Sequence, residues 1–316
     1  MLTCYYEMKV ISGTAHEAFG EEICDHLGIK KSILQVGRFK DGEININIGE
    51  SIRGCDVYLV QPTCSPTNDN LMELLILIDA CKRASAGRIS AVIPYYGYAR
   101  QDKKTKGRDP ITAKLVANMI ETAGADRVIA MDLHVAQIQG FFDIPVDHLT
   151  GLGALAEYFK GHIDSKETVV VSPDLGGVSR ARVFAEKLNL PLSMIEKRRP
   201  KENVSEVMNV IGEIEGKDCI IVDDMIDTAG TILNAAEALK DQGAKKVTIT
   251  ATHGVLSGPA MERIAASCVE ECVVTNTIPQ EDKMKETSKL KVVNISKSFA
   301  EVIQRVHCND SVSLLF

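Results

Sequence analysis

The chain has 316 residues, of which 45% are hydrophobic and 25% are charged, a balance typical of a folded globular protein. Lys and Arg number 36 against 43 Asp and Glu, and the resulting net charge of −7 argues against a general nucleic-acid binder with a basic face. At about 150 residues per domain the length predicts two domains, and no stretch approaches the roughly 18 apolar residues of a membrane span.

Short β-branched segments alternate with longer amphipathic segments along most of the chain. The predicted strands span residues 56–61, 88–94, 127–132, 168–173, 192–196, 219–223, 246–252 and 271–276. The predicted helices between them span residues 70–84, 112–122, 151–159, 178–188 and 231–242. This alternation is typical of βαβ units and of a mainly parallel sheet flanked by helices. The sequence therefore predicts an α/β fold.

A short internal repeat indicates that the two halves are similar. The pentapeptides GADRV and GAKKV begin at Gly124 and Gly243, and a histidine, His134 or His253, follows ten residues after each glycine. A match this short also arises by chance, but it agrees with the length. The turn-forming residues at 150–153 suggest the boundary. We predict an N-terminal domain of residues 1–150 and a C-terminal domain of residues 151–316.

The cysteines and the N-terminus bear on the cellular compartment. Nine cysteines are dispersed without a CxxC pair, a pattern that favours buried thiols in a reducing environment. The first residues carry acidic side chains and no long apolar segment, so we expect neither a signal peptide nor a transit peptide. We therefore expect a cytoplasmic protein.

Polar and charged residues follow several predicted strands. Ligands of open α/β sheets bind beyond the carboxyl ends of the strands. After strand 88–94, residues 100–108 contain five cations and one acid. Such a run is usually a solvated surface, but at this place it predicts binding of a nucleotide polyphosphate.

Three further side chains are placed to bind a metal ion. Asp132 and His134 lie at the end of strand 127–132, and Asp174 follows strand 168–173. Residues two apart in an extended chain point to the same side, and Mg²⁺ is usually held by few protein groups together with phosphates. A lone histidine at a strand end is more often structural, but the two aspartates favour a Mg²⁺–triphosphate site.

Residues 197–201 form a second cationic segment, directly after strand 192–196. Phosphoryl transfer requires positioned cations opposite the charge that spreads over the transferred group. Pro200 and the polar residues after it indicate a mobile flap that closes over the reaction. A solvated turn is the alternative.

Residues 223–231, with the sequence DDMIDTAGT, join strand 219–223 to the next helix. The threonines supply hydroxyls, and the Ala-Gly pair lets backbone N–H groups at the helix N-terminus approach an anion. The adjacent acids can accept hydrogen bonds from vicinal hydroxyls. A helix capped by Asp227 or Thr228 is the alternative. The segment predicts a cradle for ribose 5-phosphate formed by Asp223, Asp224, Asp227, Thr228, Ala229, Gly230 and Thr231.

This segment resembles the signature of the phosphoribosyltransferase-like fold, and further motifs are similar, in order, to those of the ribose-phosphate pyrophosphokinase family. They are RFKDGE at 38–43, YARQDKK at 98–104, MDLH at 131–134, QIQGFFDIPV at 137–146, SPD at 172–174 and KRR at 197–199. The resemblance covers essentially the whole chain. It implies two phosphoribosyltransferase-like domains, an ATP-side domain at 1–150 and a ribose 5-phosphate-binding domain at 151–316.

The resemblance implies transfer of the β,γ-diphosphoryl group of ATP to the C1 hydroxyl of ribose 5-phosphate. It also implies the residues that act. ATP is expected to contact Phe39, Asp41 and Glu43, supplied in this family by a neighbouring subunit, and Arg100, Gln101, Asp102, Lys103 and His134. Lys197 is the expected catalytic lysine, and Arg199 is expected to assist it and to bind ribose 5-phosphate. The expected Mg²⁺ ligands are His134, Asp174 and Asp132, with Asp143 and Asp147 as secondary candidates.

Regulation and assembly are also implied by the resemblance. Members of this type are commonly homohexamers that inorganic phosphate activates and ADP inhibits. The expected regulatory residues are Ser51, Arg53, Arg108, Ser311 and Ser313. Ala136, His148 and Gly107 depart from residues that the family often carries, which bears on the strength of this regulation. No nucleic-acid or membrane partner is expected.

Two other functions have to be weighed. A phosphoribosyltransferase would share the 223–231 segment, but it needs neither a second α/β half nor the cationic segments at 100–108 and 197–201. A non-catalytic regulatory relative typically has a damaged pentose loop or an insertion near the flap, whereas both motifs are intact here. The synthetase reaction is therefore favoured.

Overall fold

The computed structural model describes residues 6–198 and 207–315, apart from the side chains at 197, 198, 207 and 314. These residues form two compact units. The first contains the described residues up to 150, residues 277–279 and the segment from 295 onward. The second contains the described residues of 151–276 and residues 280–294. The chain therefore passes between the units several times.

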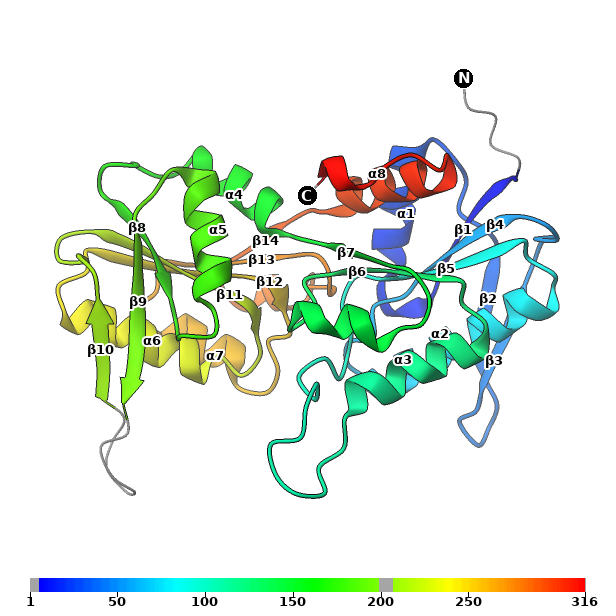
Figure 1. The fold of residues 1–316 in the computed structure, drawn as a ribbon, viewed down its shortest axis with the longest axis horizontal. Coiled ribbons are helices and arrows are strands. Elements are labelled where there is room, and N and C mark those ends of the chain that lie inside the picture. Colours follow the sequence, from blue (N-terminus) through cyan, green and yellow to red (C-terminus); the bar gives the residue numbers. More distant parts are fainter. Residues whose placement is uncertain (1–5, 199–206, 316) are drawn as a thin grey trace. The chain divides into compact units, whose positions relative to one another are not determined.

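A five-stranded parallel sheet forms the centre of the first unit (Figure 1). Its strands lie in the order β1 (Met8–Ser12), β4 (Asp56–Val60), β5 (Arg88–Ile93), β6 (Arg127–Met131) and β7 (Val146–Leu149). One face is covered by α1 (Glu17–Leu27) and α8 (Ser296–His307), and the other by α2 (Thr67–Arg83) and α3 (Thr112–Ala123). The unit also contains an antiparallel hairpin and three 3-10 helices, which are β2 (Leu34–Arg38), β3 (Ile44–Ile48), η1 (Thr14–His16), η2 (Ala136–Phe141) and η4 (Ser313–Leu315).

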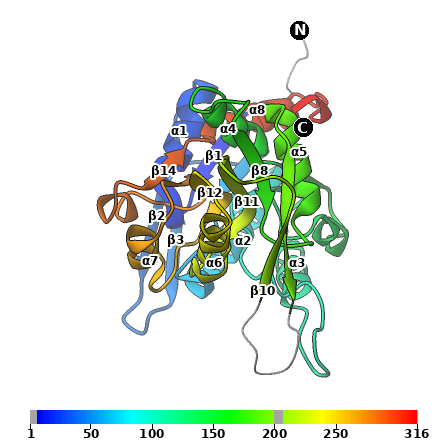
Figure 2. The same cartoon turned by 90° about the vertical axis from the view of Figure 1, so that its left-hand side faces the viewer.

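The second unit has a seven-stranded sheet (Figure 2). Its strands lie in the order β10 (Val207–Ile211), β9 (Leu192–Arg198), β8 (Thr168–Ser172), β11 (Asp218–Ile226), β12 (Lys246–Gly254), β13 (Glu271–Thr275) and β14 (Leu290–Val293). Only the β9–β10 pair is antiparallel among these described neighbours. The helices are α4 (Leu152–Lys160) and α5 (Val178–Leu188) on one face, α6 (Gly230–Asp241) and α7 (Ala260–Ala266) on the other, and the short η3 (Lys283–Lys285).

The predicted α/β fold class is confirmed, and all eight predicted strands and all five predicted helices are present. The internal repeat, however, joins strands that are not equivalent. β6, which follows Gly124, is fourth in the series β1-β4-β5-β6-β7, whereas β12, which follows Gly243, is third in the series β8-β11-β12-β13-β14. The similarity of the two units therefore lies in their topology. None of the helices in the described part of the chain has the length and apolarity that crossing a membrane requires.

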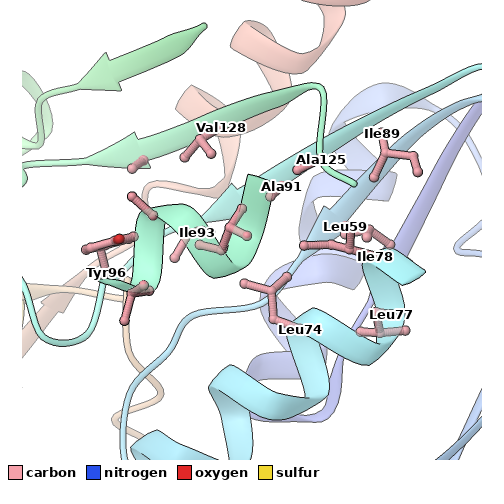
Figure 3. Close-up of a cluster of buried hydrophobic side chains, with 14 of the residues drawn as sticks. Leu59, Leu74, Leu77, Ile78, Ile89, Ala91, Ile93, Tyr96, Ala125 and Val128 are labelled. Carbon is pink, nitrogen blue, oxygen red and sulfur yellow. The ribbon is translucent and has the colours of Figure 1, made fainter. Parts of the chain in front are cut away.

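The strands of the first sheet are buried because helices cover both of its faces. Leu59 of β4 and Ile93 of β5 are fully buried and belong to one cluster with Leu74 and Leu77 of α2 (Figure 3). Burying a side chain of this size stabilises the fold by about 1.5–3 kcal/mol. The core thus fixes the strands whose carboxyl ends precede the candidate site loops of this unit.

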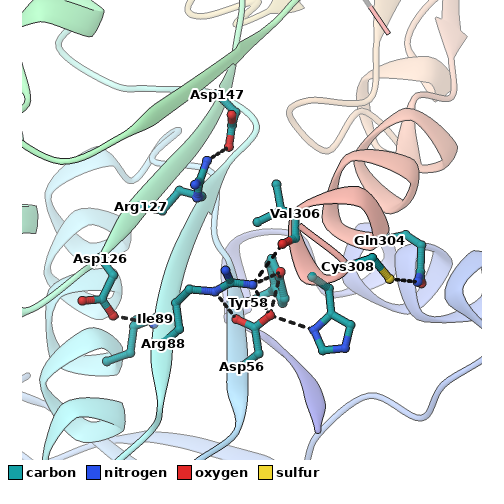
Figure 4. Close-up of polar contacts among 11 residues, drawn as sticks. Asp56, Tyr58, Arg88, Ile89, Asp126, Arg127, Asp147, Gln304, Val306 and Cys308 are labelled. Carbon is teal, nitrogen blue, oxygen red and sulfur yellow. Dashed lines mark hydrogen bonds and ion pairs between the residues drawn. The ribbon is translucent and has the colours of Figure 1, made fainter. Parts of the chain in front are cut away.

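A buried polar cluster attaches α8 to the first sheet (Figure 4). Arg88 donates to both carboxylate oxygens of Asp56, at 2.7 and 2.5 Å, and Nδ1 of His307 lies 2.7 Å from Oδ2 of the same residue. Burial raises the pKa of Asp56, but the hydrogen bonds from Arg88 and His307 outweigh it, so the pKa is lowered overall. His307 is the last residue of α8, so its contact with Asp56 joins this helix to the sheet of the first unit. The predicted division at residue 150 had assigned α8 to the C-terminal domain, whereas α8 belongs to the first unit.

Candidate active site

The predicted pentose-phosphate segment begins inside a strand. β11 continues to Ile226, so Asp223 and Asp224 belong to the strand itself. Asp224 is buried, and the side chain of Asp223 is 30% exposed. Nη1 of Arg180 lies 3.2 Å from Oδ1 of Asp223 and 3.6 Å from Oδ1 of Asp224. One guanidinium group therefore faces two neighbouring carboxylates.

Arg180 is a candidate site residue that the sequence analysis missed. It lies in the first turn of α5, which follows β8, the strand that neighbours β11 in the sheet. A basic side chain in the first turn opposes the helix dipole unless an acidic group compensates it. The position of Arg180 in the first turn of a predicted helix therefore indicates an acidic partner, but the sequence does not show that this partner is Asp223 and Asp224.

The two carboxylates perturb one another. Burial of Asp223 and the charge of Asp224 raise the pKa of Asp223 to about 7, and Arg180 opposes this shift only in part. The pair therefore retains a proton close to neutral pH. Hydroxyl donors placed against the pair favour its ionised form, because they donate hydrogen bonds to the charged oxygens.

The turn after β11 leads into a helix whose start is not capped by a side chain. The N-cap residue of α6 is Ala229, which has a left-handed φ of 62°. Its methyl side chain makes no cap hydrogen bond to the helix. The alternative with Asp227 or Thr228 at the N-cap position is therefore wrong, because Ala229 occupies that position. Thr228 and Thr231 are exposed. Their hydroxyls and the first N–H groups of α6 suit a phosphate group.

The first unit carries a basic loop at the carboxyl edge of its own sheet. β5 and β6 are adjacent and parallel, so Arg100 and Asp132, which follow them, lie beyond the same edge. The carboxylate of Asp109 accepts hydrogen bonds from the Thr105 hydroxyl at 2.8 Å and from the Lys106 N–H at 2.7 Å. These bonds lower the pKa of Asp109 and order the loop. Of its predicted ATP-binding residues, Arg100, Gln101 and Lys103 are exposed and Asp102 is half-buried.

Asp132, Leu133 and His134 form a tight turn after β6. Asp132 has a left-handed φ of 35°, and the Leu133 N–H donates to Nε2 of His148 at 2.9 Å. The side chain of Gln139 contacts the other ring nitrogen of His148 at 3.2 Å. His148, which departs from the family pattern, therefore supports the turn that carries two predicted magnesium ligands.

The remaining predicted magnesium ligands differ in their surroundings. Asp174 is exposed, and its Oδ1 accepts the Gly177 N–H at 2.9 Å. Asp143 is also exposed, whereas Oδ2 of Asp147 pairs with Nη1 of Arg127 at 2.5 Å (Figure 4). Asp174 belongs to the second unit, and the other four predicted ligands belong to the first.

The donor set fits a magnesium ion that is held mainly by phosphates. Within residues 6–198 and 207–315, no group of three or more His, Cys, Asp or Glu side chains forms a preassembled metal site. Magnesium typically takes one or two carboxylates and completes its shell with substrate phosphates and water. Asp132 and Asp174, as carboxylates beyond strand ends, are chemically suitable for that role.

The β2–β3 hairpin presents an aromatic ring to solvent. Phe39 at its tip is 56% exposed, and Asp41 and Glu43 are exposed beside it. The tip is ordered because the Phe39 N–H donates to the Glu43 carbonyl at 2.9 Å and Arg38 pairs with Asp69 at 2.9 Å. A fixed aromatic face next to carboxylates suits stacking on a base and hydrogen bonding to a ribose.

The predicted catalytic and regulatory residues are less completely described. The backbone of Lys197 pairs with Met208 across β9 and β10, so this residue lies in the sheet and not in a flap. Arg199 and the rest of the expected flap lie outside the described residues. Ser51, Arg53 and Arg108 are exposed, and the hydroxyls of Ser311 and Ser313 lie 2.6 Å apart. All five predicted regulatory residues belong to the first unit.

Comparison with known proteins links these features to one family. Residues 8–124 match the model of the N-terminal domain of ribose phosphate pyrophosphokinase, and residues 197–316 match the phosphoribosyl synthetase-associated domain. The ribose-phosphate pyrophosphokinase of Clostridium perfringens is 59% identical over 313 residues, which cover 98% of this chain and 97% of the relative. That of Caldanaerobacter subterraneus is 58% identical over 309 residues, which cover 98% of each chain.

A solved structure agrees with these relatives. The crystal structure of phosphoribosylpyrophosphate synthetase from Mycobacterium smegmatis matches with a TM-score of 0.90 at 45% sequence identity. The match covers 96% of this chain and 99% of that chain, so it extends over both units. The chain therefore belongs to the ribose-phosphate pyrophosphokinase family.

Proposed function

We propose that this chain transfers the β,γ-diphosphoryl group of ATP to the C1 hydroxyl of ribose 5-phosphate, giving 5-phosphoribosyl 1-diphosphate and AMP for nucleotide biosynthesis. The observation that carries the proposal is the 223–231 segment, in which an acidic pair in the carboxyl-terminal part of β11 precedes a helix whose N-cap residue is Ala229. A pentose phosphate requires both features, because its hydroxyls donate hydrogen bonds and its phosphate is an anion.

The acceptor substrate is held at both of its ends. Asp223 and Asp224 accept hydrogen bonds from the ring hydroxyls, and Arg180 orients the two carboxylates. Residues 227–231 surround the 5-phosphate with hydroxyls and backbone N–H groups. A substrate held in this way has lost much of its freedom before the reaction begins, which lowers the barrier to transfer.

The donor substrate binds to the first unit. The basic loop and His134 contact the triphosphate, while Phe39, Asp41 and Glu43 of a neighbouring copy contact the adenosine. Lys197 and Arg199 supply positive charge to the diphosphoryl group during transfer. Their chemistry supports this role, because phosphoryl transfer depends on positioned cations more than on covalent participation of the protein.

Magnesium is the cofactor of the proposed reaction. Asp132, His134 and Asp174 are the proposed ligands, each of which would act together with the phosphates of ATP. Bound magnesium neutralises charge on the triphosphate. His148 keeps the turn that carries Asp132 and His134 in place through the Leu133 N–H.

The assembly and the regulation are further parts of the proposal. The ordered, exposed hairpin tip fits a homohexamer in which adjacent copies share each ATP site. Inorganic phosphate is the proposed activator and ADP the proposed inhibitor, and both bind at Ser51, Arg53, Arg108, Ser311 and Ser313. We place this reaction in the cytoplasm, without a nucleic-acid or membrane partner.

The test is AMP formation from ATP by the purified protein. We expect AMP only when ribose 5-phosphate and Mg²⁺ are both present, with 5-phosphoribosyl 1-diphosphate as the second product. A phosphoribosyltransferase would instead consume 5-phosphoribosyl 1-diphosphate together with a base. If ATP, ribose 5-phosphate and Mg²⁺ yield no AMP, the proposed function is wrong.

A further inference from the structure

In the second unit, a later segment of the chain makes hydrogen bonds to the proposed pentose-phosphate loop, residues 223–231. We call residues 256–263 the clamp segment. Within it, the Ser257 N–H donates to the Asp227 carbonyl at 3.0 Å, and the Ser257 hydroxyl donates to the Asp227 carboxylate. Both the backbone and the side chain of Asp227 are therefore fixed by one residue that lies thirty positions later in the sequence.

Arg263 of α7 reaches the next residue of the loop. Its Nη1 donates to the Thr228 carbonyl at 3.0 Å. A Cβ added at Gly230 would lie 3.4 Å from the same nitrogen, so the guanidinium group passes directly beside the first residue of α6. Arg263 is exposed. Its charge is thus placed at the helix terminus that the proposed phosphate would approach.

The charge of Arg263 requires anionic groups close to this helix terminus. A helix N-terminus carries partial positive charge, which attracts anions and repels cations. The 223–231 segment itself contains three aspartates and no basic residue. A dianionic phosphate beside these acids needs a cation from another part of the chain, and Arg263 is in position to provide one.

The conformation of the loop also requires support. Ala229 has a φ of 62°, and a left-handed conformation costs a residue with a Cβ about 1–2 kcal/mol. Such strain persists only where the surrounding structure over-determines it. Ser257 and Arg263 hold the two residues immediately before Ala229, so the clamp segment supplies that constraint.

We propose that Arg263 is a positioning residue for ribose 5-phosphate, which fixes the Thr228 carbonyl and offsets the acidity of the loop when the phosphate group binds. This inference rests on the proposed function. Arg263 belongs to the acceptor side only. Its loss therefore raises the KM for ribose 5-phosphate and leaves kcat and the KM for ATP close to those of the wild type.

The experiment compares three substitutions at one position by steady-state AMP formation. Arg263→Ala is expected to raise the KM for ribose 5-phosphate about 10-fold, the effect of losing one charge-assisted hydrogen bond. Arg263→Lys retains the charge and restores most of the affinity, whereas Arg263→Gln retains only a donor and restores little. The ratio of the KM values of Arg263→Ala and wild type falls as ionic strength rises. Arg182→Ala, an exposed arginine of α5, is the matched control and leaves both KM values unchanged.

Several results would overturn the inference. One is a KM for ribose 5-phosphate that Arg263→Ala does not change, and another is equal restoration by Lys and Gln. A loss of kcat alone also contradicts it. If Arg263→Ala does not fold, the Lys and Gln variants still separate charge from hydrogen bonding. An inactive wild-type protein refutes the proposed function, whereas an active one with an unaffected Arg263→Ala refutes only this inference.

Discussion

The segments after β4 and β11 occupy the same place in the two sheets but differ in what their polar groups contact. Each strand is second in its series of five parallel strands. After β4, Thr63 is buried, and its hydroxyl donates to the Tyr95 carbonyl at 3.2 Å and accepts the Gly97 N–H at 2.7 Å. After β11, Thr228 is exposed and precedes a helix without a side-chain cap. The Thr63 hydroxyl is thus used by other groups of the protein, whereas the Thr228 side chain is open to solvent, where the proposed phosphate would bind.

Under the proposed function, this difference lets one topology serve two substrates. In the first unit, the segment after β4 supports Tyr95 and Gly97, which lead from β5 into the basic loop at 100–108. The proposed triphosphate site therefore lies after the third strand of its series, whereas the proposed pentose-phosphate site lies after the second strand of the other. The topology determines where a loop emerges, and the polar groups of each loop determine whether it binds a ligand.

The largest expected effect comes from a residue outside the two proposed substrate loops, residues 100–108 and 223–231. It tests whether the chemical step depends on a side chain that neither loop supplies. Lys197 belongs to neither loop. We expect Lys197→Ala to lower kcat about 10²–10³-fold, as loss of one electrostatic donor to a transition state does. KM values for both substrates should stay close to those of the wild type. Steady-state AMP formation measures this, and a raised KM with an unchanged kcat would make Lys197 a binding residue.

The next effect tests the acceptor loop alone. Asp224→Asn removes one charged acceptor from a buried pair, so the KM for ribose 5-phosphate should rise about 10- to 100-fold. ATP binding should not change, because the proposed triphosphate loop lies in the other unit. Asp241→Asn, at the exposed end of α6, is the control. A variant with weaker ATP binding and normal affinity for ribose 5-phosphate would reverse our assignment of the two loops.

The two loops also differ in how much of them could be predicted from sequence. The 223–231 segment was identified because its acids, hydroxyls and small residues are contiguous. Arg180 and Arg263 were missed because they come from other helices, and only the fold brings them to the loop. The sequence also did not predict that the hydroxyl of Thr63, after β4, is used in hydrogen bonds within the protein, since its partners lie more than thirty residues away.

Strand prediction succeeded for the central strands of both large sheets, whereas the edge strands β1, β7, β10 and β14 were not predicted. β8, with three consecutive valines, is buried at every position, and such a run is recognisable in the sequence. The β2–β3 hairpin was missed because its residues alternate between exposed and half-buried and it stands outside the parallel sheet. Lys197 was placed in a flap because its neighbours are cationic, yet pairing with β10 keeps its backbone in a strand.

A smaller effect comes from the proton shared by the acidic pair. Asp223 has a pKa of about 7, raised by burial and by Asp224. Ribose hydroxyls bind the ionised form, so the proton competes with substrate at low pH and is absent at high pH. The KM for ribose 5-phosphate should therefore fall about 10-fold from about pH 6 to about pH 8, with most of the change near the raised pKa.

The substrate phosphate also titrates, near pH 6, and Asp223→Asn separates the two contributions. This variant keeps the titration of the substrate and loses that of the pair. The ratio of its KM to that of the wild type should rise with pH. A constant ratio would mean that the proton on Asp223 does not oppose substrate binding.

The smallest effects address the comparison of the two segments directly, by the same isosteric change in each. Thr63→Val leaves the Gly97 N–H and the Tyr95 carbonyl without this hydroxyl, at a cost of about 1–3 kcal/mol. We expect a Tm lower by about 4 °C and unchanged KM values. Thr228→Val removes an exposed hydroxyl, so Tm should stay within about 1 °C, while the KM for ribose 5-phosphate rises about 5-fold.

The two variants are informative as a pair because each is the other's control. Scanning calorimetry gives the Tm of each variant, and AMP formation gives its KM for ribose 5-phosphate. These four values show whether each hydroxyl stabilises the fold or binds substrate. If Thr63→Val raised the KM for ribose 5-phosphate while Thr228→Val lowered Tm, the two segments would have exchanged roles. If both variants lost stability without a change in KM, the hydroxyl of Thr228 would stabilise the fold, as that of Thr63 does, and would not bind the phosphate of the substrate.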